Sequence, residues 1–591
     1  MQDVSVTRKY ATELRLAVLA VACAASFGFL FQLQQTPLFE HLAGKSYTMF
    51  LWADRLARGT AGPGQAFYGP PLPLWYLSGI VSLFGPGMGV VRLLGGIACV
   101  CACALTWDVG RRWGGEAVGL LSALGLALYG PLYYYEATLP GTALTICLML
   151  GGLAAALRAD QRHRMGFWAA SGALFGAAAL ARPNLHLLAL GLGLWALIGG
   201  AGGWRRRIAA LALVVVGWAA AQGLHTVIDL HLYGRSDNAP TWGISLYVGN
   251  GPGASVGYGT VPFVRASNQD DDVSSFVAEA ARRTGRPLDV AAAGRFWAGE
   301  TLRYMLRRPA AAAGLILRKA AMCLAPAEIP DNWDYQFWTD RLPVLRWMLR
   351  FGHIMALCVV GLALGVMFRR RATALLGLLL VAYCASMVVT FVLGRYRVLA
   401  VPVLLVWAAA GLLNLSDGVR RLRPRAIAAL VAVALLTGGL LLLPPPYDAR
   451  ATESNAWVDL GVLYEQDGRP DQAARAYAEA LQVNDRQLIA HIYLGDILAA
   501  SGDVAGAIGH YEAAGAVGPL SPAEMVRLGR MWLEHGDSAA ASAWLLRALA
   551  AQPGAAPAYK GLAACWRRDG WRLGWGAARS EGGLASSGGG G

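Results

Sequence analysis

Charged residues are scarce in this chain of 591 residues. Asp, Glu, Lys and Arg together make up 15% of the sequence, whereas hydrophobic residues make up 56%. A typical soluble domain carries about 25% charged residues, so this composition excludes a soluble globular protein for most of the chain and predicts a polytopic membrane protein. Lysine is especially rare, because only four of the 51 Lys and Arg residues are Lys.

The net charge of +14 therefore comes from arginine. Many of these arginines cluster in short loops between apolar segments, where basic residues set the orientation of a membrane protein. This placement argues against nucleic-acid binding, the other common reason for a basic chain. The nine cysteines show no spacing typical of a disulfide framework or a metal site. We therefore expect no dedicated metal site. The sequence leaves open whether a divalent cation assists the chemistry.

Eleven apolar segments are predicted to cross a bilayer as helices. Arg8 and Lys9 precede the first, which we predict to be an uncleaved span with its N-terminus in the cytoplasm. With eleven spans, five arginine-rich loops all fall on the cytoplasmic side. The predicted spans are residues 14–33, 90–107, 117–135, 140–157, 166–182, 184–199, 208–229, 347–368, 372–392, 398–414 and 426–443.

Two further apolar segments are not predicted to cross. Residues 71–84 are short and begin with two prolines, which suits a re-entrant or interfacial helix. Residues 310–326 carry Arg318 and Lys319 near their centre, where a charge costs a few kcal/mol inside a bilayer, so we expect an amphipathic helix on the outer surface. This organisation predicts a transmembrane domain over residues 1–444, with long outer loops at 34–89 and 230–346.

Glycine recurs with a period of 34 residues in the last part of the chain, after three consecutive prolines at 444–446. This period is typical of tetratricopeptide repeats, in which pairs of antiparallel helices stack into a solenoid. We predict three repeats and part of a fourth over residues 445–575, with a concave face suited to a peptide or protein partner, and a disordered tail at 576–591. The periodic glycines are Gly461, Gly495 and Gly529, and also Gly468, Gly502, Gly536 and Gly570.

Four segments of the predicted outer face form a recognisable set. In order and placement they resemble the glycosyltransferase C superfamily, and within it the protein mannosyltransferase-like and aminoarabinose-transferase-like branch with C-terminal tetratricopeptide repeats. The segments are Tyr47 with Trp52-Ala53, Arg58-Gly59 and residues 67–72 of the first loop, then 247–254, 328–335, and Arg395-Tyr396-Arg397.

The resemblance implies a membrane glycosyltransferase that moves a sugar from a polyprenyl-phosphate-linked donor to a protein, lipid or glycan acceptor. It implies an all-α membrane domain in a bacterial inner membrane, surrounded by membrane lipids, with the site and the repeats on the periplasmic side. Chemistry of this type needs a carboxylate that deprotonates an acceptor hydroxyl, and cations that stabilise the departing lipid phosphate.

Three carboxylates are candidates for the base. The resemblance places the first-loop carboxylate nearest Glu40, but the superfamily usually has Asp about four residues before the Tyr, whereas Glu40 precedes Tyr47 by seven. The assignment therefore stays open between Glu40 and Asp54, although Asp54 stands beside Arg55, which favours a surface ion pair. Glu136, at the outer end of a predicted span, is the third candidate.

Guanidinium groups can hold two phosphate oxygens at once, so Arg395 and Arg397 are predicted to bind the lipid phosphate, with anchoring at the membrane interface as the alternative. Arg182 and Asn184 are placed similarly, although Pro183 between them also marks a simple helix break. The predicted substrate-binding residues are Tyr47, Tyr68, Arg182, Asn184, Asn250, Lys319, Asn332, Arg395, Tyr396 and Arg397.

Two other functions compete with the enzyme. One is a membrane-anchored repeat scaffold for assembly of envelope glycans or proteins, which would need neither many spans nor a polar, aromatic first loop. The other is a transporter, which would place polar residues and broken helices near the middle of the bilayer. The charged residues instead gather at the ends of the predicted spans, which favours the enzyme.

Overall fold

The computed structural model describes most of residues 2–568. Its described residues form helices joined by turns and contain no β-strand, so the all-α prediction is confirmed. The chain divides into two compact units, residues 1–447 and 448–591. Residues outside the description are 1, 43, 62–66, 68, 163, 201, 234–240, 258–260, 262, 265–268, 331–333, 364–370, all but isolated positions of 421–446, and 569–591.

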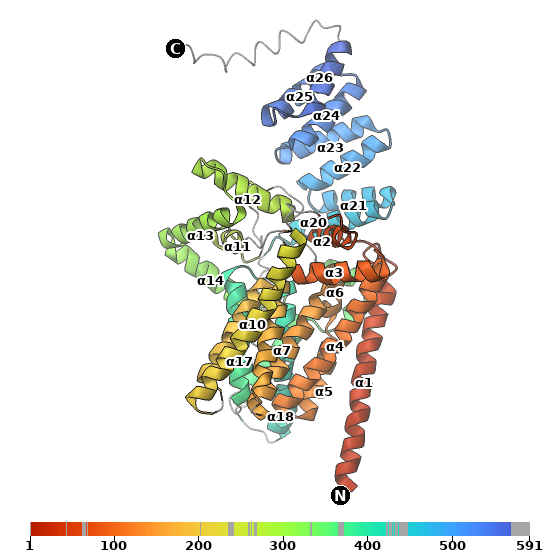
Figure 1. The fold of residues 1–591 in the computed structure, drawn as a ribbon. Helices are drawn as coiled ribbons and strands as arrows, with labels where there is room; N and C mark the ends of the chain where they lie inside the picture. The colour runs from red at the N-terminus through yellow and green to blue at the C-terminus, as the bar shows by residue number, and fades with distance from the viewer. Residues whose placement is uncertain are drawn as a thin grey trace. The chain divides into compact units, whose positions relative to one another are not determined.

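The first unit is a bundle of long helices with shorter helices at one end (Figure 1). Its elements are α1 (Gln2–Leu33), α2 (Gly44–Ala57), α3 (Pro71–Phe84), α4 (Met88–Gly114), α5 (Glu116–Ala127), α6 (Gly130–Thr138), α7 (Thr142–Arg162), α8 (Gly166–Ala181), η1 (Pro183–Leu185), α9 (His186–Ile198), α10 (Trp204–Tyr233), α11 (Trp242–Asn250), α12 (Gln269–Thr284), α13 (Val290–Arg307), α14 (Pro309–Leu324), α15 (Tyr335–Arg341), η2 (Pro343–Trp347), α16 (Phe351–Ala363), α17 (Arg371–Val389) and α18 (Gly394–Arg420).

Six described helices are long and apolar enough to cross a membrane, namely α1, α4, α7, α10, α17 and α18. Each overlaps a predicted span, and the chain is a multi-pass membrane protein. Helices α3, α5 and α8 and the pair η1 and α9 are apolar but shorter, so the number of eleven spans stays a prediction. The last predicted span, 426–443, lies almost wholly outside the described residues.

The prediction of one continuous span over residues 117–135 is wrong, because α5 and α6 are separate helices. Pro131, in the first turn of α6, has no N–H to continue a helix from α5. A distant residue pairs with the backbone at the break: the Leu349 N–H donates to the Leu128 carbonyl at 2.7 Å, and the Gly130 N–H donates to the Leu349 carbonyl at 3.1 Å. These bonds satisfy polar groups that would be costly to leave unpaired inside a bilayer.

Helices α2 and α3 build the first predicted loop, and α3 lies across the upper ends of the long helices in Figure 1. The two pack together through a hydrophobic cluster that includes Trp52, Leu74 and Leu77. The short helix predicted at 71–84 is present as α3, and Pro71 stands in its first turn, where a missing N–H is tolerated.

Helix α14 occupies the segment predicted to be amphipathic. Lys319 and Cys323 are buried on one of its faces, whereas Leu317 and Leu324 are exposed. It is not among the helices long and apolar enough to span a membrane. This distribution agrees with a helix that rests on a surface.

Arginines gather at the ends of α4 and α7. The carboxylate of Asp108 accepts hydrogen bonds from Arg111 at 2.9 Å, from Arg112 at 2.8 Å and from Arg158 at 2.8 Å. Two loops that the sequence places on the cytoplasmic side are therefore joined by one carboxylate. The membrane side on which they lie stays a prediction.

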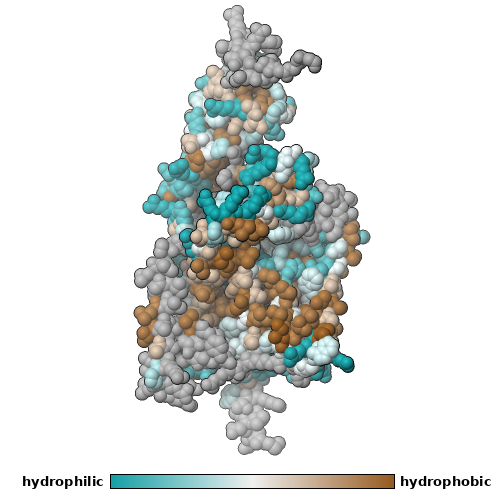
Figure 2. Space-filling model, turned by 90° about the vertical axis from the view of Figure 1, so that its left-hand side faces the viewer, coloured by the Kyte–Doolittle hydropathy of each residue, from teal (hydrophilic) through white to brown (hydrophobic). Residues whose placement is uncertain are grey.

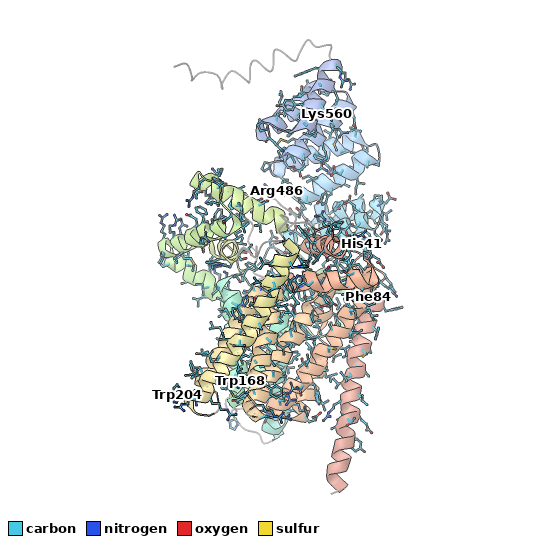
Figure 3. All side chains as sticks on the ribbon, viewed as in Figure 1. His41, Phe84, Trp168, Trp204, Arg486 and Lys560 are labelled. Atoms are coloured by element: carbon cyan, nitrogen blue, oxygen red, sulfur yellow. The ribbon has the colours of Figure 1, made fainter. Side chains whose placement is uncertain are left out.

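The surface of α10 is apolar along much of its length. Val216, Leu224 and Val227 are each more than 60% exposed, and Figure 2 shows hydrophobic residues in a band on the face where α10 lies. Trp204, at the start of α10, lies at the opposite end of the bundle from His41 and Phe84 (Figure 3). Exposed apolar residues with an aromatic residue at the helix end are typical of a surface that faces lipid.

The second unit consists of three helix pairs and one further helix among its described residues. In each of the first two pairs, a periodic glycine lies against a tyrosine: a Cβ atom on Gly461 would lie 2.3 Å from the Tyr477 ring, and one on Gly495 would lie 2.8 Å from that of Tyr511. The predicted repeat domain is confirmed. Its helices are α20 (Ala449–Gln466), α21 (Pro470–Val483), α22 (Leu488–Ala500), α23 (Val504–Val517), α24 (Pro522–His535), α25 (Ser538–Ala551) and α26 (Ala556–Arg568). The predicted tail at 576–591 lies outside the described residues.

Candidate functional site

Two arginines meet at the aromatic ring of Tyr396. The guanidinium carbon of Arg182 lies 5.3 Å from the ring centroid, and that of Arg395 lies 5.2 Å from it. Arg182 stands at the junction of α8 and η1, whereas Arg395 and Tyr396 stand in the first turn of α18. All three side chains are half-buried. The structure therefore brings together three predicted substrate-binding residues that are far apart in the sequence. We call these three residues the Tyr396 cluster.

Helix α17 holds the Tyr396 cluster in place. The hydroxyl of Tyr383 donates to the Tyr396 carbonyl at 2.8 Å, which fixes the start of α18. The side-chain amide of Asn184 donates to the Ser386 hydroxyl at 3.2 Å, which fixes the turn after Arg182. Asn184, another predicted binding residue, thus lies at the edge of the cluster and positions its backbone.

Arg397 turns away from the Tyr396 cluster and is buried. Its guanidinium donates to the Ala325 carbonyl at 2.7 Å and to the Ala327 carbonyl at 2.5 Å, and it lies 3.4 Å from the Glu328 carboxylate. Its guanidinium carbon also lies 4.0 Å from the ring centroid of Phe351. These contacts fasten the segment after α14 to the start of α18. Binding of the lipid phosphate by Arg397 stays a prediction that this geometry does not favour.

Lys319 and Asn250 belong to a second buried polar cluster. The Lys319 ammonium donates to the Gly249 carbonyl at 2.7 Å, to the Asn250 side-chain oxygen at 2.9 Å and to the Thr390 carbonyl at 2.5 Å. Burial lowers the pKa of Lys319 to about 8. Three acceptors use all three N–H groups of an ammonium. Lys319 therefore joins α11, α14 and α17.

Close packing explains why glycine stands at position 249 in this cluster. A Cβ atom there would lie 2.1 Å from the Thr390 carbonyl oxygen, so no larger residue fits against α17. The segment 247–254, one of the four that carry the resemblance, thus brings the end of α11 against the end of α17.

A buried arginine that the sequence analysis did not select holds the first loop. Arg92, on α4, is 4% exposed. Its guanidinium donates to the carbonyls of Leu38 at 2.5 Å and Phe39 at 3.1 Å, and also to that of Ala137 on α6. Its presence inside an otherwise apolar segment was the signal that could have revealed it. Arg92 joins the first loop to α6, and so fixes the backbone beside Glu40.

Glu136 lies next to Arg92 and closes the start of α7. Its carboxylate accepts from the Gly141 N–H at 3.1 Å and from the Ala143 N–H at 2.6 Å. Burial raises the pKa of Glu136 to about 7, and the two backbone N–H groups and the charge of Arg92 oppose that rise. Gly95 provides the space, because a Cβ atom there would lie 2.7 Å from the carboxylate. Glu136 also borders a small cavity between α1, α4 and α6.

The other candidate residues of the first loop differ in exposure. Glu40 is exposed to solvent, one residue after the Phe39 carbonyl that Arg92 holds. Asp54 forms an ion pair at 2.9 Å with Arg58, which directly follows the end of α2. Tyr47 is 39% exposed and does not belong to the Tyr396 cluster as described. Tyr68 and Asn332 lie outside the described residues.

Helix α6 and the start of α18 are in close contact beside Gly394. A Cβ atom on Gly394 would lie 2.2 Å from the Tyr135 hydroxyl and 2.8 Å from the Ile329 carbonyl. Tyr135 precedes Glu136 on α6, and Gly394 precedes Arg395 on α18. Within the described part of the chain, no group of three or more His, Cys, Asp or Glu residues is placed to hold a metal ion.

Sequence comparison supports the two-part organisation. Residues 68–221 match the family model of dolichyl-phosphate-mannose-protein mannosyltransferases, and residues 458–522 match a tetratricopeptide repeat model. The resemblance to the mannosyltransferase-like branch with C-terminal repeats is thereby confirmed in both parts of the chain. The first match includes Arg92, Glu136 and Arg182. No curated protein sequence matches the chain.

Solved structures are similar at low sequence identity. ArnT from Cupriavidus metallidurans, in a crystal structure with bound undecaprenyl phosphate, is 17% identical with a TM-score of 0.38, over 88% of this chain and 80% of ArnT. The apo oligosaccharyltransferase of Archaeoglobus fulgidus is 15% identical with a TM-score of 0.40, over 79% of this chain and 60% of that one. The oligosaccharyltransferase AglB from the same organism, in complex with an inhibitory peptide and a dolichol-phosphate, is 15% identical with a TM-score of 0.38, over 79% of this chain and 59% of AglB.

Proposed function

We propose that this protein is an integral membrane glycosyltransferase that takes a sugar from a polyprenyl-phosphate-linked donor and transfers it to an acceptor at the outer face of a bacterial inner membrane. The observation that carries the proposal is the Tyr396 cluster, in which two half-buried guanidinium groups lie against one ring. Guanidinium binds phosphate oxygens through charge-assisted hydrogen bonds, and two of them suit the charge of a lipid phosphate. The mannosyltransferase family match supports the same reaction class.

The cluster has a direct role in the proposed reaction. The acceptor hydroxyl loses its proton to a carboxylate, and its oxygen attacks the anomeric carbon of the sugar. The bond between that carbon and the phosphate oxygen breaks, and the polyprenyl phosphate leaves with the bonding electrons. Arg182 and Arg395 stabilise the charge that grows on the leaving phosphate. Lys319 and Arg397 hold the surrounding helices, and so keep the two arginines in place.

Glu40 is the carboxylate that we assign to the base. It is exposed to an acceptor, and Arg92 fixes the backbone on its N-terminal side. Asp54 is already paired with Arg58, and both oxygens of Glu136 accept backbone hydrogen bonds. Glu136 is thus better placed to position α6 and α7 than to meet an acceptor.

A donor-turnover assay tests the proposal without knowledge of the acceptor. The protein in nanodiscs is incubated with a panel of polyprenyl-phosphate-linked hexoses and pentoses together with a bacterial envelope extract that supplies the acceptor, and release of polyprenyl phosphate is measured. Glu40→Gln is expected to lower turnover by about 10²- to 10⁴-fold, the usual effect of losing a general base. The matched control is Glu300→Gln on α13. If no donor is turned over by the parent protein, the proposal fails, and a membrane-anchored repeat scaffold is the function to test next.

A further inference from the structure

Two cysteines from different helices face each other near the Tyr396 cluster. Cys323 stands on α14 and is 6% exposed, whereas Cys384 stands on α17 and is half-buried. The two thiols share a hydrogen bond. All nine cysteines of the chain are free thiols in the structure. The proposed sugar transfer uses none of them, so this pair has no role in the reaction described above.

Helix α14 presents the Cys323 side chain to α17. Lys319 and Cys323 are the buried residues of α14, and residues four apart lie on the same face of a helix. The Lys319 ammonium donates to the Thr390 carbonyl, just after α17. Arg397 donates to the Met322 carbonyl at 3.4 Å, directly before Cys323. The helix is thus held on both sides of Cys323, and its thiol is fixed opposite Cys384.

Cys384 lies at the level of the candidate phosphate site. Tyr383, directly before it, donates to the Tyr396 carbonyl, and Ser386, two residues after it, accepts from the Asn184 side chain. Under the proposed function, on which this depth rests, these contacts lie at the lipid headgroups and not in the middle of the bilayer. Cys384 is half-buried there, so an oxidant on the outer side can reach its sulfur.

Two other cysteines use their thiols differently. Cys147 donates to the Ala98 carbonyl at 3.3 Å, and Cys358 donates to the Leu404 carbonyl at 2.9 Å. In these contacts cysteine serves as a small side chain with a weak donor between packed helices. Cys323 instead meets a second thiol, from a helix about 60 residues further along the chain. Two facing thiols on helices held against each other are the arrangement from which a disulfide forms.

We propose that Cys323 and Cys384 form a reversible disulfide that ties α14 to α17. The oxidant is the disulfide of a small thiol or of a thiol oxidoreductase, which the oxidising periplasm of a bacterium supplies. The Cys384 thiolate attacks one sulfur of that disulfide, so that a mixed disulfide forms and one thiol leaves. The Cys323 thiolate then attacks the Cys384 sulfur, and the second thiol leaves. Two cysteine thiols are oxidised, and one disulfide is reduced to two thiols.

Peptide mapping of the whole protein tests this proposal and needs neither sugar donor nor acceptor, so its outcome is independent of the turnover assay. The protein in nanodiscs is treated with glutathione disulfide, free thiols are blocked with N-ethylmaleimide, and tryptic peptides are analysed by mass spectrometry without reduction. We expect residues 320–341 and 372–395 to be joined, with the loss of two hydrogen atoms, and a phosphine reductant to separate them. The control Cys147→Ala, at a half-buried cysteine of α7, should keep this link.

A stability measurement tests whether the disulfide ties the two helices together. The oxidised parent should need more sodium dodecyl sulfate to unfold than the reduced parent, because a cross-link restricts the unfolded chain. Cys384→Ala should abolish this difference, whereas Cys147→Ala should retain it. Blocking of both Cys323 and Cys384 by N-ethylmaleimide after oxidation would overturn the proposal. Equal unfolding of the oxidised and reduced parent would overturn it as well.

Discussion

Replacement of Arg397 by Met separates the structural role of this residue from phosphate binding. The change removes a guanidinium that is 1% exposed, and takes this partner away from the Ala325 and Ala327 carbonyls and from the Glu328 carboxylate. Removing one partner of a buried ion pair typically costs about 3–5 kcal/mol, because the remaining charge is left uncompensated. We expect Arg397→Met to lower the free energy of unfolding by about that amount. Arg397→Lys keeps the charge but loses the planar fork, so we expect a loss of roughly 1–3 kcal/mol.

Unfolding by sodium dodecyl sulfate in mixed micelles measures this effect. Because the bonds hold residues 325–328, protease cleavage near that segment should also rise. Glu328→Gln added to Arg397→Met should recover part of the loss, since it removes the unpaired charge. Arg303→Met, a change at an exposed arginine of α13, is the control. Normal stability of Arg397→Met together with weak donor binding would refute this reasoning and return Arg397 to the phosphate site, as the sequence predicted.

Burial raises the pKa of Glu136 above its value in the unfolded chain, so its protonation stabilises the fold below about pH 4.5 and this contribution is lost by about pH 7. Between pH 4.5 and pH 8, the free energy of unfolding of the parent should therefore fall by about 3 kcal/mol relative to that of Glu136→Gln in denaturation experiments. A constant difference between the two proteins would contradict the assignment. Lys319→Met leaves three acceptors unsatisfied and should lower stability by about 2–4 kcal/mol in the same assay, whereas Lys560→Met, at an exposed site of the repeat unit, should not. A phosphatase reporter fused after Asn455 should be active if the repeats are periplasmic, and an active cytoplasmic reporter at that site would reverse the topology.

The sequence was sufficient for the parts of the fold that depend on local pattern. Apolar length predicted α1, α4, α7, α10, α17 and α18, and the glycine period predicted the helix pairs of the repeats, because both signals repeat over many residues. The break between α5 and α6 was missed because it depends on pairing with Leu349, more than 200 residues away. Gly130 and Pro131 together were the only local sign of it.

The sequence predicted several residues of the candidate site, but not the directions in which their side chains point. Arg395 and Arg397 were assigned the same role. Residues two apart on a helix are rotated by about 200° around its axis, however, and so lie on nearly opposite faces. Once α18 starts at Gly394, the two guanidinium groups cannot share one face. The approach of Arg182 to Tyr396 depends on how η1 and α18 both pack against α17, which no local pattern in these segments reveals.

The most direct test of the central claim is the lipid that binds at the Tyr396 cluster. The protein is incubated in detergent with undecaprenyl phosphate and analysed by native mass spectrometry, as the parent, as Arg182→Ala with Arg395→Ala, and as the control Arg303→Ala. We expect one lipid phosphate bound to the parent and to the control. The double variant should bind it at least about 10-fold more weakly, since each charge-assisted hydrogen bond contributes about 1.5–3 kcal/mol. Equal occupancy in all three proteins would show that the cluster does not bind the donor phosphate.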